Sequence, residues 1–273
     1  MIDHLKSFTA FLFFCLAAPV AADNSVSILD DDSKDTLVIG ILEDEGVFAH
    51  WNFITHQYDG FAVDVAKELC NDHKRNCLIA SGTADSIEQM LVDGRVDFAM
   101  ASVGDVLAKS HKLSFSDPYY SAHPVFFTKD SSYYSIGSGD LAGKSVGSKI
   151  GTVIFSKLAE LLKKDEIAEL KAYSSNQAMF DDLQAGYLDF ICLDSVSGFD
   201  SMKQLSEYSN VAEFYAVNQD GFMGLNNVYA RVVVRADKRA KANIKAINNA
   251  LNELKSKGTY QALEMKYFPF IHF

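Results

Sequence analysis

The chain has 273 residues, and its 36 acidic against 25 basic side chains give a formal net charge of −11 at pH 7. This balance argues against nucleic acid as a partner, because phosphate binding requires clustered Lys and Arg. After residue 22, no apolar stretch approaches the roughly 20 residues that cross a bilayer, so no membrane span is expected there.

Residues 1–22 have the pattern of a cleaved secretory signal peptide. A lysine precedes the apolar stretch Phe8–Ala18, and the small residues Val20–Ala22 suit signal peptidase. An uncleaved membrane anchor is the alternative, but the apolar run is short and a good cleavage site follows it. The pattern predicts a soluble, exported chain of residues 23–273.

The first half of the exported chain alternates strands with helices. Apolar, β-branched residues at 36–42 predict a buried strand, and residues 60–70 carry apolar side chains at helical spacing. A strand at 77–80, a helix at 85–94 that ends on glycine, and a strand at 96–102 follow. Strands that alternate with helices predict crossover units and a parallel sheet.

Three cysteines remain after cleavage. Cys70 and Cys77 stand at the corner between the first helix and the next strand, where they can close a small disulfide loop in an oxidising compartment. A metal site is the alternative, but no further Cys or His lies at ligand spacing, so we expect the disulfide and no metal. Cys192 lies inside an apolar strand and is predicted to be a buried, inert thiol.

The second half repeats the alternation. Its expected elements are a strand at 144–150, a helix at 152–164, a strand at 167–174, a helix at 176–186 and a strand at 187–194.

One phrase occurs almost unchanged in both halves. LVDGRVDFAM at 91–100 and LQAGYLDFIC at 183–192 share glycine, aspartate and phenylalanine in the same order. The matched pairs are Gly94 with Gly186, Asp97 with Asp189 and Phe98 with Phe190. A chance match is the alternative, but the common order favours one helix–glycine–strand unit in each of two α/β lobes.

Polar residues follow both copies of the phrase. Ser102 and Gly104 come after the first copy, and Asp194 and Ser195 after the second. Because ligands bind beyond the carboxyl ends of parallel strands, two facing lobes would place these residues in a cleft. The acidic loop at 43–46 borders the same cleft and can attract a cation; a solvated acidic turn is the favoured interpretation.

Motifs for catalysis are missing. The sequence contains no G-x-S-x-G, no H-E-x-x-H, no phosphate loop and no C-x-x-C. Five histidines, at 50, 56, 73, 111 and 123, share no spacing and are expected at the surface or in packing. An exported two-lobed chain without a catalytic set is predicted to bind a ligand and not to be an enzyme.

Six segments in order resemble the family 3 solute-binding proteins of amino-acid ABC importers, most closely the histidine and lysine/arginine/ornithine branch. They are GFAVDVAKELC, DGRVDFAMAS, LSFSDPYYSA, LAGKSVGSKIGT, LQAGYLDFICLDS and LNELKSKGTYQALEMKYF. The branch also has a disulfide that looks like Cys70–Cys77. The resemblance implies a cofactor-free, monomeric periplasmic receptor. It would capture a small polar solute, most naturally an amino acid, and hand it to an inner-membrane ABC permease.

The resemblance also implies the fold. It is an α/β, two-lobed clamshell of the type II periplasmic-binding-protein kind, with crossovers near Ser121–Ala122 and Arg231–Val232. Lobe 1 would comprise residues 23–121 and 232–273, and lobe 2 residues 122–231.

The resemblance also implies ligand-binding roles for individual residues of this sequence. Phe48 or Trp51 stands where an aromatic ring sandwiches the ligand side chain, although lobe packing explains either one equally well. Thr152 begins a helix, whose N-terminus suits an anion. Asp194 stands where a carboxylate receives the α-ammonium group; it can also cap the helix that follows, and both roles can coexist.

The carboxylate end of the site departs from the family. Ser102 lies where main-chain and hydroxyl groups meet the α-carboxylate, but Gly104 replaces a usual hydroxyl residue. Lys109 replaces an arginine and cannot make the planar two-bond fork; a solvated lysine is the alternative. Val153 and Ile154 replace a polar pair. Either the ligand is not a plain α-amino acid, or other groups compensate.

Two other functions are compatible with the same fold. One is a cyclohexadienyl dehydratase-like enzyme, which needs an acid in the cleft and for which Asp194 is the candidate. The other is a sensor or binding module that takes no part in transport.

Overall fold

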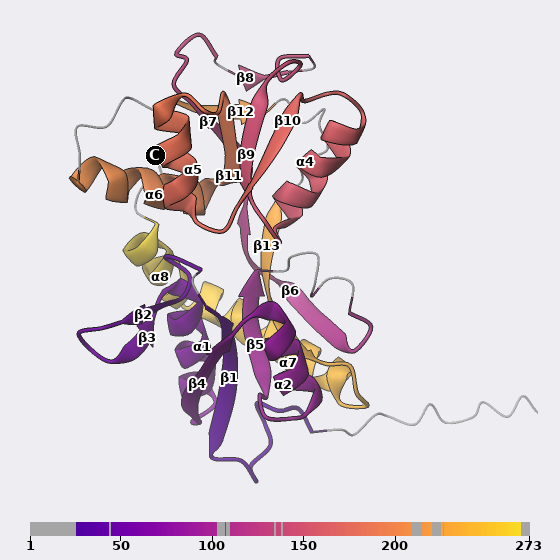
Figure 1. Cartoon of the computed structure of the whole chain (residues 1–273). Helices are drawn as coiled ribbons and strands as arrows, with labels where there is room; N and C mark the ends of the chain where they lie inside the picture. Colours follow the sequence, from indigo (N-terminus) through magenta and orange to yellow (C-terminus); the bar gives the residue numbers. More distant parts are fainter. Residues whose placement is uncertain are drawn as a thin grey trace, which may run out of the picture.

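The protein consists of two sheet-centred lobes joined at a narrow waist (Figure 1). This computed structural model describes residues 26–43, 45–102, 107, 110–133, 135–137, 139–208, 215–219, 225 and 227–268. The expected signal peptide lies outside these residues. No helix in the described ranges is long and apolar enough to cross a membrane.

The first lobe is built on a five-stranded sheet with strand order β4-β1-β5-β13-β6. Strands β4, β1 and β5 run parallel, whereas β13 is antiparallel to both β5 and β6. The strands are β1 (Thr36–Leu42), β4 (Asn76–Gly82), β5 (Phe98–Ser102), β6 (Leu113–Ala122) and β13 (Val228–Arg235). The helices are α1 (Phe61–Asp72), α2 (Ala84–Val92), α7 (Ala240–Ser256) and α8 (Thr259–Tyr267), and a small hairpin pairs β2 (His50–Asn52) with β3 (Gln57–Asp59).

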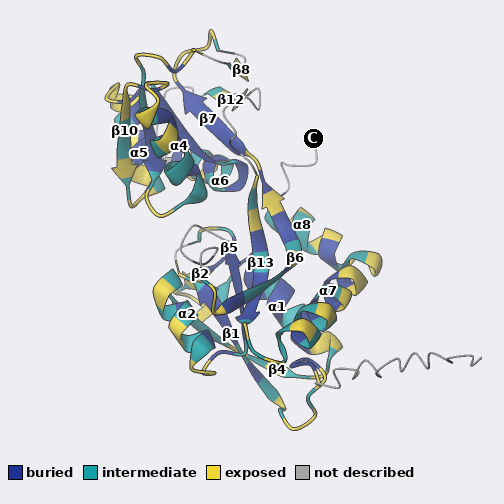
Figure 2. Cartoon of the chain, turned by 90° about the vertical axis from the view of Figure 1, so that its right-hand side faces the viewer, coloured by how far each residue is buried: buried dark blue, intermediate teal, exposed yellow. Residues whose placement is uncertain are grey.

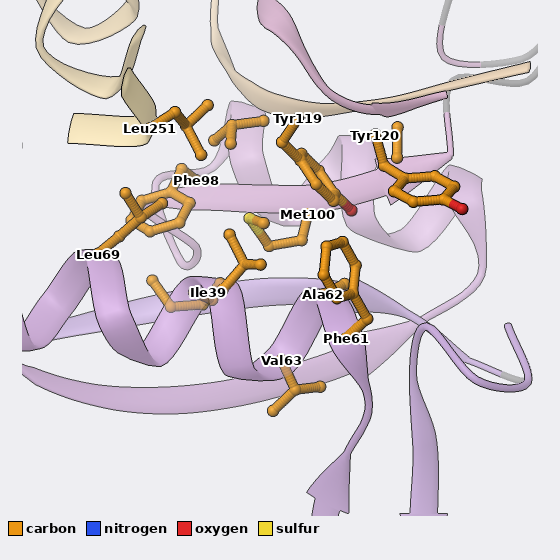
Figure 3. Close-up of a cluster of buried hydrophobic side chains, with 14 of the residues drawn as sticks. Ile39, Phe61, Ala62, Val63, Leu69, Phe98, Met100, Tyr119, Tyr120 and Leu251 are labelled. Atoms are coloured by element: carbon orange, nitrogen blue, oxygen red, sulfur yellow. The ribbon is translucent and has the colours of Figure 1, made fainter. Parts of the chain in front are cut away.

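Both faces of this sheet are buried, which explains the continuous apolar runs in its central strands. On one face, Phe98 and Met100 of β5 pack with Phe61 of α1 and Leu251 of α7 (Figure 3). On the other face, the intervening residues of β5 pack with Ile87 of α2 and its neighbours.

The second lobe has a six-stranded sheet with the order β10-β9-β11-β7-β12-β8. Its strands are β7 (Pro124–Thr128), β8 (Ser135–Ile136), β9 (Ser145–Lys149), β10 (Glu169–Tyr173), β11 (Phe190–Asp194) and β12 (Tyr215–Gln219). Helices α4 (Val153–Lys163), α5 (Asn176–Ala185) and α6 (Ser195–Tyr208) complete it. Alternate residues of β11 enter two cores: Phe190 and Cys192 join one, and Ile191 and Leu193 the other.

The waist contains the antiparallel pair β6–β13 (Figure 2). The chain leaves the first sheet after Ala122 and enters the second at Pro124; it returns between the end of β12 and Val228. Val228 pairs with Ala122, and Arg231 with Pro118, so both expected crossovers lie on this strand pair. The two-lobed α/β fold expected from the sequence is confirmed, while the lobe boundaries at 121/122 and 231/232 remain proposals.

The repeated phrase has a structural role in each lobe. Asp97 accepts a hydrogen bond from the Val38 amide of β1 at 2.8 Å, and Asp189 accepts one from the Ser145 amide of β9 at 2.8 Å. Each aspartate amide donates back to the carbonyl of the same partner, and each carboxylate also pairs with a lysine. The phrase therefore fastens the entry of one parallel strand to its neighbour.

The cysteine predictions are confirmed. Cys70 at the end of α1 and Cys77 at the start of β4 form a disulfide, with their Cα atoms 6.1 Å apart. Cys192 is a free, fully buried thiol in β11. Burial, with the nearby Asp194 carboxylate, raises its pKa well above the usual value, so it is kept as an unreactive thiol.

Candidate functional site

A cavity of about 750 Å³ lies between the two lobes, a volume that suits a small-molecule ligand. Its wall includes residues at the carboxyl ends of β1 and β5 in one lobe and of β9 and β11 in the other. The polar and aromatic residues of its wall include Glu45, Phe48, Ser102, Tyr120, Lys149, Thr152, Asp194 and Asp200.

Four of the predicted site residues line this one cavity: Phe48, Ser102, Thr152 and Asp194. Trp51 does not. It lies on the β2–β3 hairpin, keeps 39% of its surface exposed, and packs edge-on against Tyr58 with the ring centres 5.0 Å apart. Of the two aromatic candidates, the structure therefore brings only Phe48 to the cavity. Gly104 and Lys109 lie outside the described residues.

Phe48 forms an aromatic wall together with residues that the sequence analysis missed. Its ring centre lies 5.2 Å from that of Tyr120 and 5.5 Å from that of Phe268. Tyr120 also lines the cavity. Phe48 is almost completely buried, so its contribution to ligand binding is a fixed apolar surface. Aromatic residues on segments distant in sequence gave no local signal that they share one cluster.

Asp194 stands at the junction of β11 and α6. One carboxylate oxygen, Oδ1, accepts the amide of Ser197 at 2.9 Å and so caps α6. The amide of Ser195 donates to the carbonyl of His123 beside the crossover, at 2.8 Å. The side chain is partly exposed and lines the cavity. Capping is thus present, and the same carboxylate faces the space where a ligand would lie.

Thr152 caps the helix on the same wall. Its hydroxyl accepts the amide of Phe155 at 3.1 Å and donates to the carbonyl of Lys149 at 2.7 Å. The Thr152 hydroxyl already donates its proton to this carbonyl, so it is not free to donate to an anion. An anion at this place would instead be bound by the main-chain amides at the N-terminus of α4.

Glu45 also lines the cavity. The favoured sequence interpretation, a solvated acidic turn, holds for the exposed Glu43 and Gly46 but is wrong for Glu45. A tight turn fixes it: the Phe48 amide donates to the Glu45 carbonyl, and the Glu45 amide to the Ala49 carbonyl, both at 3.1 Å. Its carboxyl group hydrogen-bonds to Ser102. The sequence did contain one indication that Glu45 belongs to the site. The turn follows the carboxyl end of β1, and ligands bind beyond the carboxyl ends of parallel strands.

The electrostatic setting of Glu45 is unusual. Desolvation raises its pKa to about 7, and the Asp194 carboxylate on the opposite lobe adds to this effect. The hydrogen bonds from Ser102 and the charge of Lys149 lower the pKa but do not outweigh burial. Near neutral pH, Glu45 is therefore divided between its protonated and charged forms.

Replacing Glu45 by Gln should stabilise the unliganded protein at pH 8 by about 1–2 kcal/mol and have little effect at pH 5. The folded-state pKa lies above the usual value of 4.5, so the charged form costs stability above pH 7. That cost fades as the pH falls toward 4.5 and the folded protein takes up the proton. Because Glu45 is partly exposed to the cavity, solvent reduces the free-energy cost of its charge, and the stability gained by the substitution is correspondingly smaller. Urea unfolding at both pH values measures it.

Glu253→Gln on the exposed surface of α7 is the control, because it removes the same charge from the same lobe. It should leave stability unchanged within about 0.5 kcal/mol at both pH values. An equal gain from Glu45→Gln at pH 5 and pH 8 would contradict the buried-charge explanation.

Within the part of the chain that the structure describes, no group of three or more His, Cys, Asp or Glu side chains could hold a metal ion. The cavity wall instead combines hydrogen-bonding groups, carboxylates, one lysine and an aromatic surface, which together suit a small polar organic ligand.

A family model described as bacterial extracellular solute-binding proteins, family 3, matches residues 38–270. ABC transporter arginine-binding protein 1 of Escherichia coli strain K12 is 29% identical over 212 residues, which cover 77% of this chain and 82% of that protein. The histidine-binding periplasmic protein of Salmonella typhimurium is 26% identical over 212 residues, 77% of this chain and 79% of that protein.

Among solved structures, an ancestral amino acid-binding protein, described as a precursor of cyclohexadienyl dehydratase, has a TM-score of 0.68. Its sequence is 23% identical, and the match covers 89% of this chain and 100% of that one. At this identity the likeness shows the fold alone.

Proposed function

Because the chain belongs to the bacterial extracellular solute-binding proteins of family 3, we propose that it captures an amino-acid-like solute outside the cytoplasmic membrane and delivers it to an ABC importer. The observation that carries this proposal is the cavity between the lobes, which is lined by Asp194 from one lobe and by Ser102 from the other. The arginine- and histidine-binding names of the relatives support an amino-acid ligand.

The proposed roles follow from the geometry. Asp194 receives an ammonium group, in a partly desolvated place where a charge-assisted hydrogen bond is strong. The N-terminus of α4, beginning at Thr152, receives a carboxylate. Phe48 and Tyr120 supply the apolar surface. Ser102 adds a hydroxyl from the other lobe. Lys109, as a carboxylate partner, remains a proposal from the sequence.

A thermal-shift screen of the exported form, residues 23–273, tests the proposal. It would include amino acids, polyamines and small carboxylates. A true ligand at 100 times its dissociation constant stabilises the folded protein by ~2.7 kcal/mol, which is well above assay noise. An amino-acid hit supports the proposal, and a screen in which no amino acid shifts the melting temperature contradicts it.

Ligand binding should close the cleft. Since the cavity wall belongs to both lobes and the waist is a strand pair, a solute that touches both walls favours the closed arrangement. Small-angle scattering should show a smaller radius of gyration with the ligand found in the screen. Asp194→Asn at the same ligand concentration should keep the unliganded value. An unchanged radius at saturation would count against closure.

We infer that the protein binds without catalysis, but one observation favours the alternative enzyme. Glu45 lines the cavity with a pKa of about 7, which suits a general acid at neutral pH. A cyclohexadienyl dehydratase assay of the purified protein decides between the two. Turnover that Glu45→Gln abolishes would establish the enzyme, and its absence supports the receptor.

A further inference from the structure

The hairpin formed by β2 and β3 presents an apolar tip to solvent. Phe53 is 81% exposed and Ile54 is 90% exposed, the two highest values among the large hydrophobic side chains of the described residues. In Figure 1 the loop that joins β2 to β3 extends away from the first lobe and lies clear of the other elements. None of residues 50–59, all of which the structure describes, lines the cavity, so the proposed ligand roles leave this tip without a function.

Hydrogen bonds hold the tip in its conformation. The side-chain oxygen of Asn52 accepts the amides of Ile54 at 2.9 Å and Thr55 at 3.1 Å. Its side-chain nitrogen donates to the Asp59 carboxylate across the hairpin at 2.7 Å. An asparagine that binds main-chain amides a few positions later stabilises a turn. The exposure of the apolar side chains is therefore set by an ordered turn.

The character of the hairpin changes with distance from the tip. Behind Phe53 and Ile54 lie Trp51 and Tyr58, which pair across the two strands with their ring centres 5.0 Å apart. Such rings have an apolar body and one polar atom, and they are enriched where a membrane meets water. Residues 50–58 include no Asp, Glu, Lys or Arg, although the whole chain has a net charge of −11. The hairpin can therefore approach a bilayer without desolvating a carboxylate, ammonium or guanidinium group.

The size of the tip favours a bilayer over a second copy of the chain. A stable interface between proteins needs ~800 Å² from each partner. An aromatic side chain contributes ~150–250 Å², so Phe53, Ile54 and the partly exposed Trp51 together supply only about half of that area. A bilayer needs no matching surface, because any apolar side chain that reaches its hydrocarbon leaves water.

We propose that the tip of the β2–β3 hairpin is a membrane-contact site, which inserts Phe53 and Ile54 into a lipid bilayer and places Trp51 at the bilayer surface. Two side chains provide fewer apolar groups than a myristoyl chain, which itself binds only marginally, with a K of about 10⁴ M⁻¹, so the contact is weak and reversible. Such contact keeps a receptor near the membrane that holds its importer while allowing it to leave. The proposal goes beyond the proposed function and rests on it only for the meeting with a membrane.

The test uses the exported form, residues 23–273, because the apolar residues 8–18 would bind lipid themselves. Flotation with zwitterionic phosphatidylcholine vesicles at millimolar lipid measures the bound fraction. The double variant Phe53→Ser, Ile54→Ser should lower the partition coefficient at least ~10-fold, since full burial of each side chain is worth about tenfold or more. Tyr187→Ser is the matched control. It removes an aromatic side chain that is 66% exposed on the second lobe and should leave the partition coefficient unchanged.

A second readout uses a residue of the hairpin itself. Trp51 is the single tryptophan of the chain, so tryptophan fluorescence reports on the hairpin alone. Vesicles should shift the parent's emission to shorter wavelength and protect it from iodide, because the ring leaves water. The double variant should show neither change. It should keep the parent's melting temperature and ligand affinity, since Phe53 and Ile54 are exposed and do not line the cavity.

Each outcome decides for or against the membrane. Flotation of the parent, with a Trp51 shift that the double variant lacks, supports the proposal. No flotation and an unchanged spectrum at the highest lipid concentration would overturn it, as would flotation that the double variant retains. Flotation only with anionic vesicles at low salt would also overturn it, because that binding is electrostatic.

The other occupant has its own readout. Self-association in sedimentation velocity that the double variant abolishes, without vesicle binding, would assign the tip to a second copy and overturn the proposal. All of these results leave the receptor function standing, because the vesicle experiments contain no solute and the thermal-shift screen tests that function separately.

Discussion

Asp194→Asn is expected to weaken binding of an amine-bearing solute by at least ~100-fold, or about 2.7 kcal/mol. The carboxylate lines the cavity at the carboxyl end of β11, where an ammonium group would be partly removed from water. Removal of one partner from a buried ion pair costs ~3–5 kcal/mol, and the partial exposure of Asp194 places the expected loss at or just below this range. Calorimetry with the ligand from the screen measures it.

The fold should survive this change, because an Asn oxygen can still accept the Ser197 amide and cap α6. Asp194→Ala is the matched variant, since it removes the ligand contact and the cap together. It should bind as poorly as Asp194→Asn but also lose about 1 kcal/mol of stability. If Asp194→Asn binds as the parent does, the ligand has no ammonium group at this place and the amino-acid proposal fails with it.

Local patterns in the sequence were enough for the parallel part of both sheets. The apolar run at 36–42 corresponds to β1, and the alternating cores on either side of Phe98 explain why that strand is apolar throughout. The disulfide was equally predictable, because Cys77 follows Cys70 by only seven positions in the sequence. Such features depend on neighbours in sequence or on simple periodicity.

The cavity depends on contacts that no local pattern encodes. By its sequence alone, the 43–46 turn resembles a solvated acidic loop. The groups that interact with Glu45, Asp194 and Lys149, belong to the other lobe and are far from it in sequence. The choice between Phe48 and Trp51 depends on the placement of the β2–β3 hairpin, in which Trp51 packs against Tyr58 and does not line the cavity. These positions are set by tertiary packing.

Gly60→Ala is expected to destabilise the protein by about 3 kcal/mol or more and to disturb the cavity wall as well. Gly60 caps α1 with a φ of 137°, a backbone conformation that residues with a Cβ atom rarely adopt. A Cβ atom there would lie 2.3 Å from the Phe48 carbonyl oxygen. The same carbonyl accepts the Ala62 amide at 3.0 Å, so neither the helix nor the turn can move without losing this bond.

Gly186→Ala is the matched control, because Gly186 also has a positive φ, 80°, but no atom lies within 4 Å of its would-be Cβ. It should cost only the ~1–2 kcal/mol of the left-handed conformation. Urea unfolding measures both variants, and ligand calorimetry should show weaker binding for Gly60→Ala alone, since the displaced turn carries Glu45 and Phe48. If Gly60→Ala and Gly186→Ala lose the same stability, the 45–49 turn must move easily to accommodate the new Cβ atom. A turn that moves so easily could not hold Glu45 in position for a ligand.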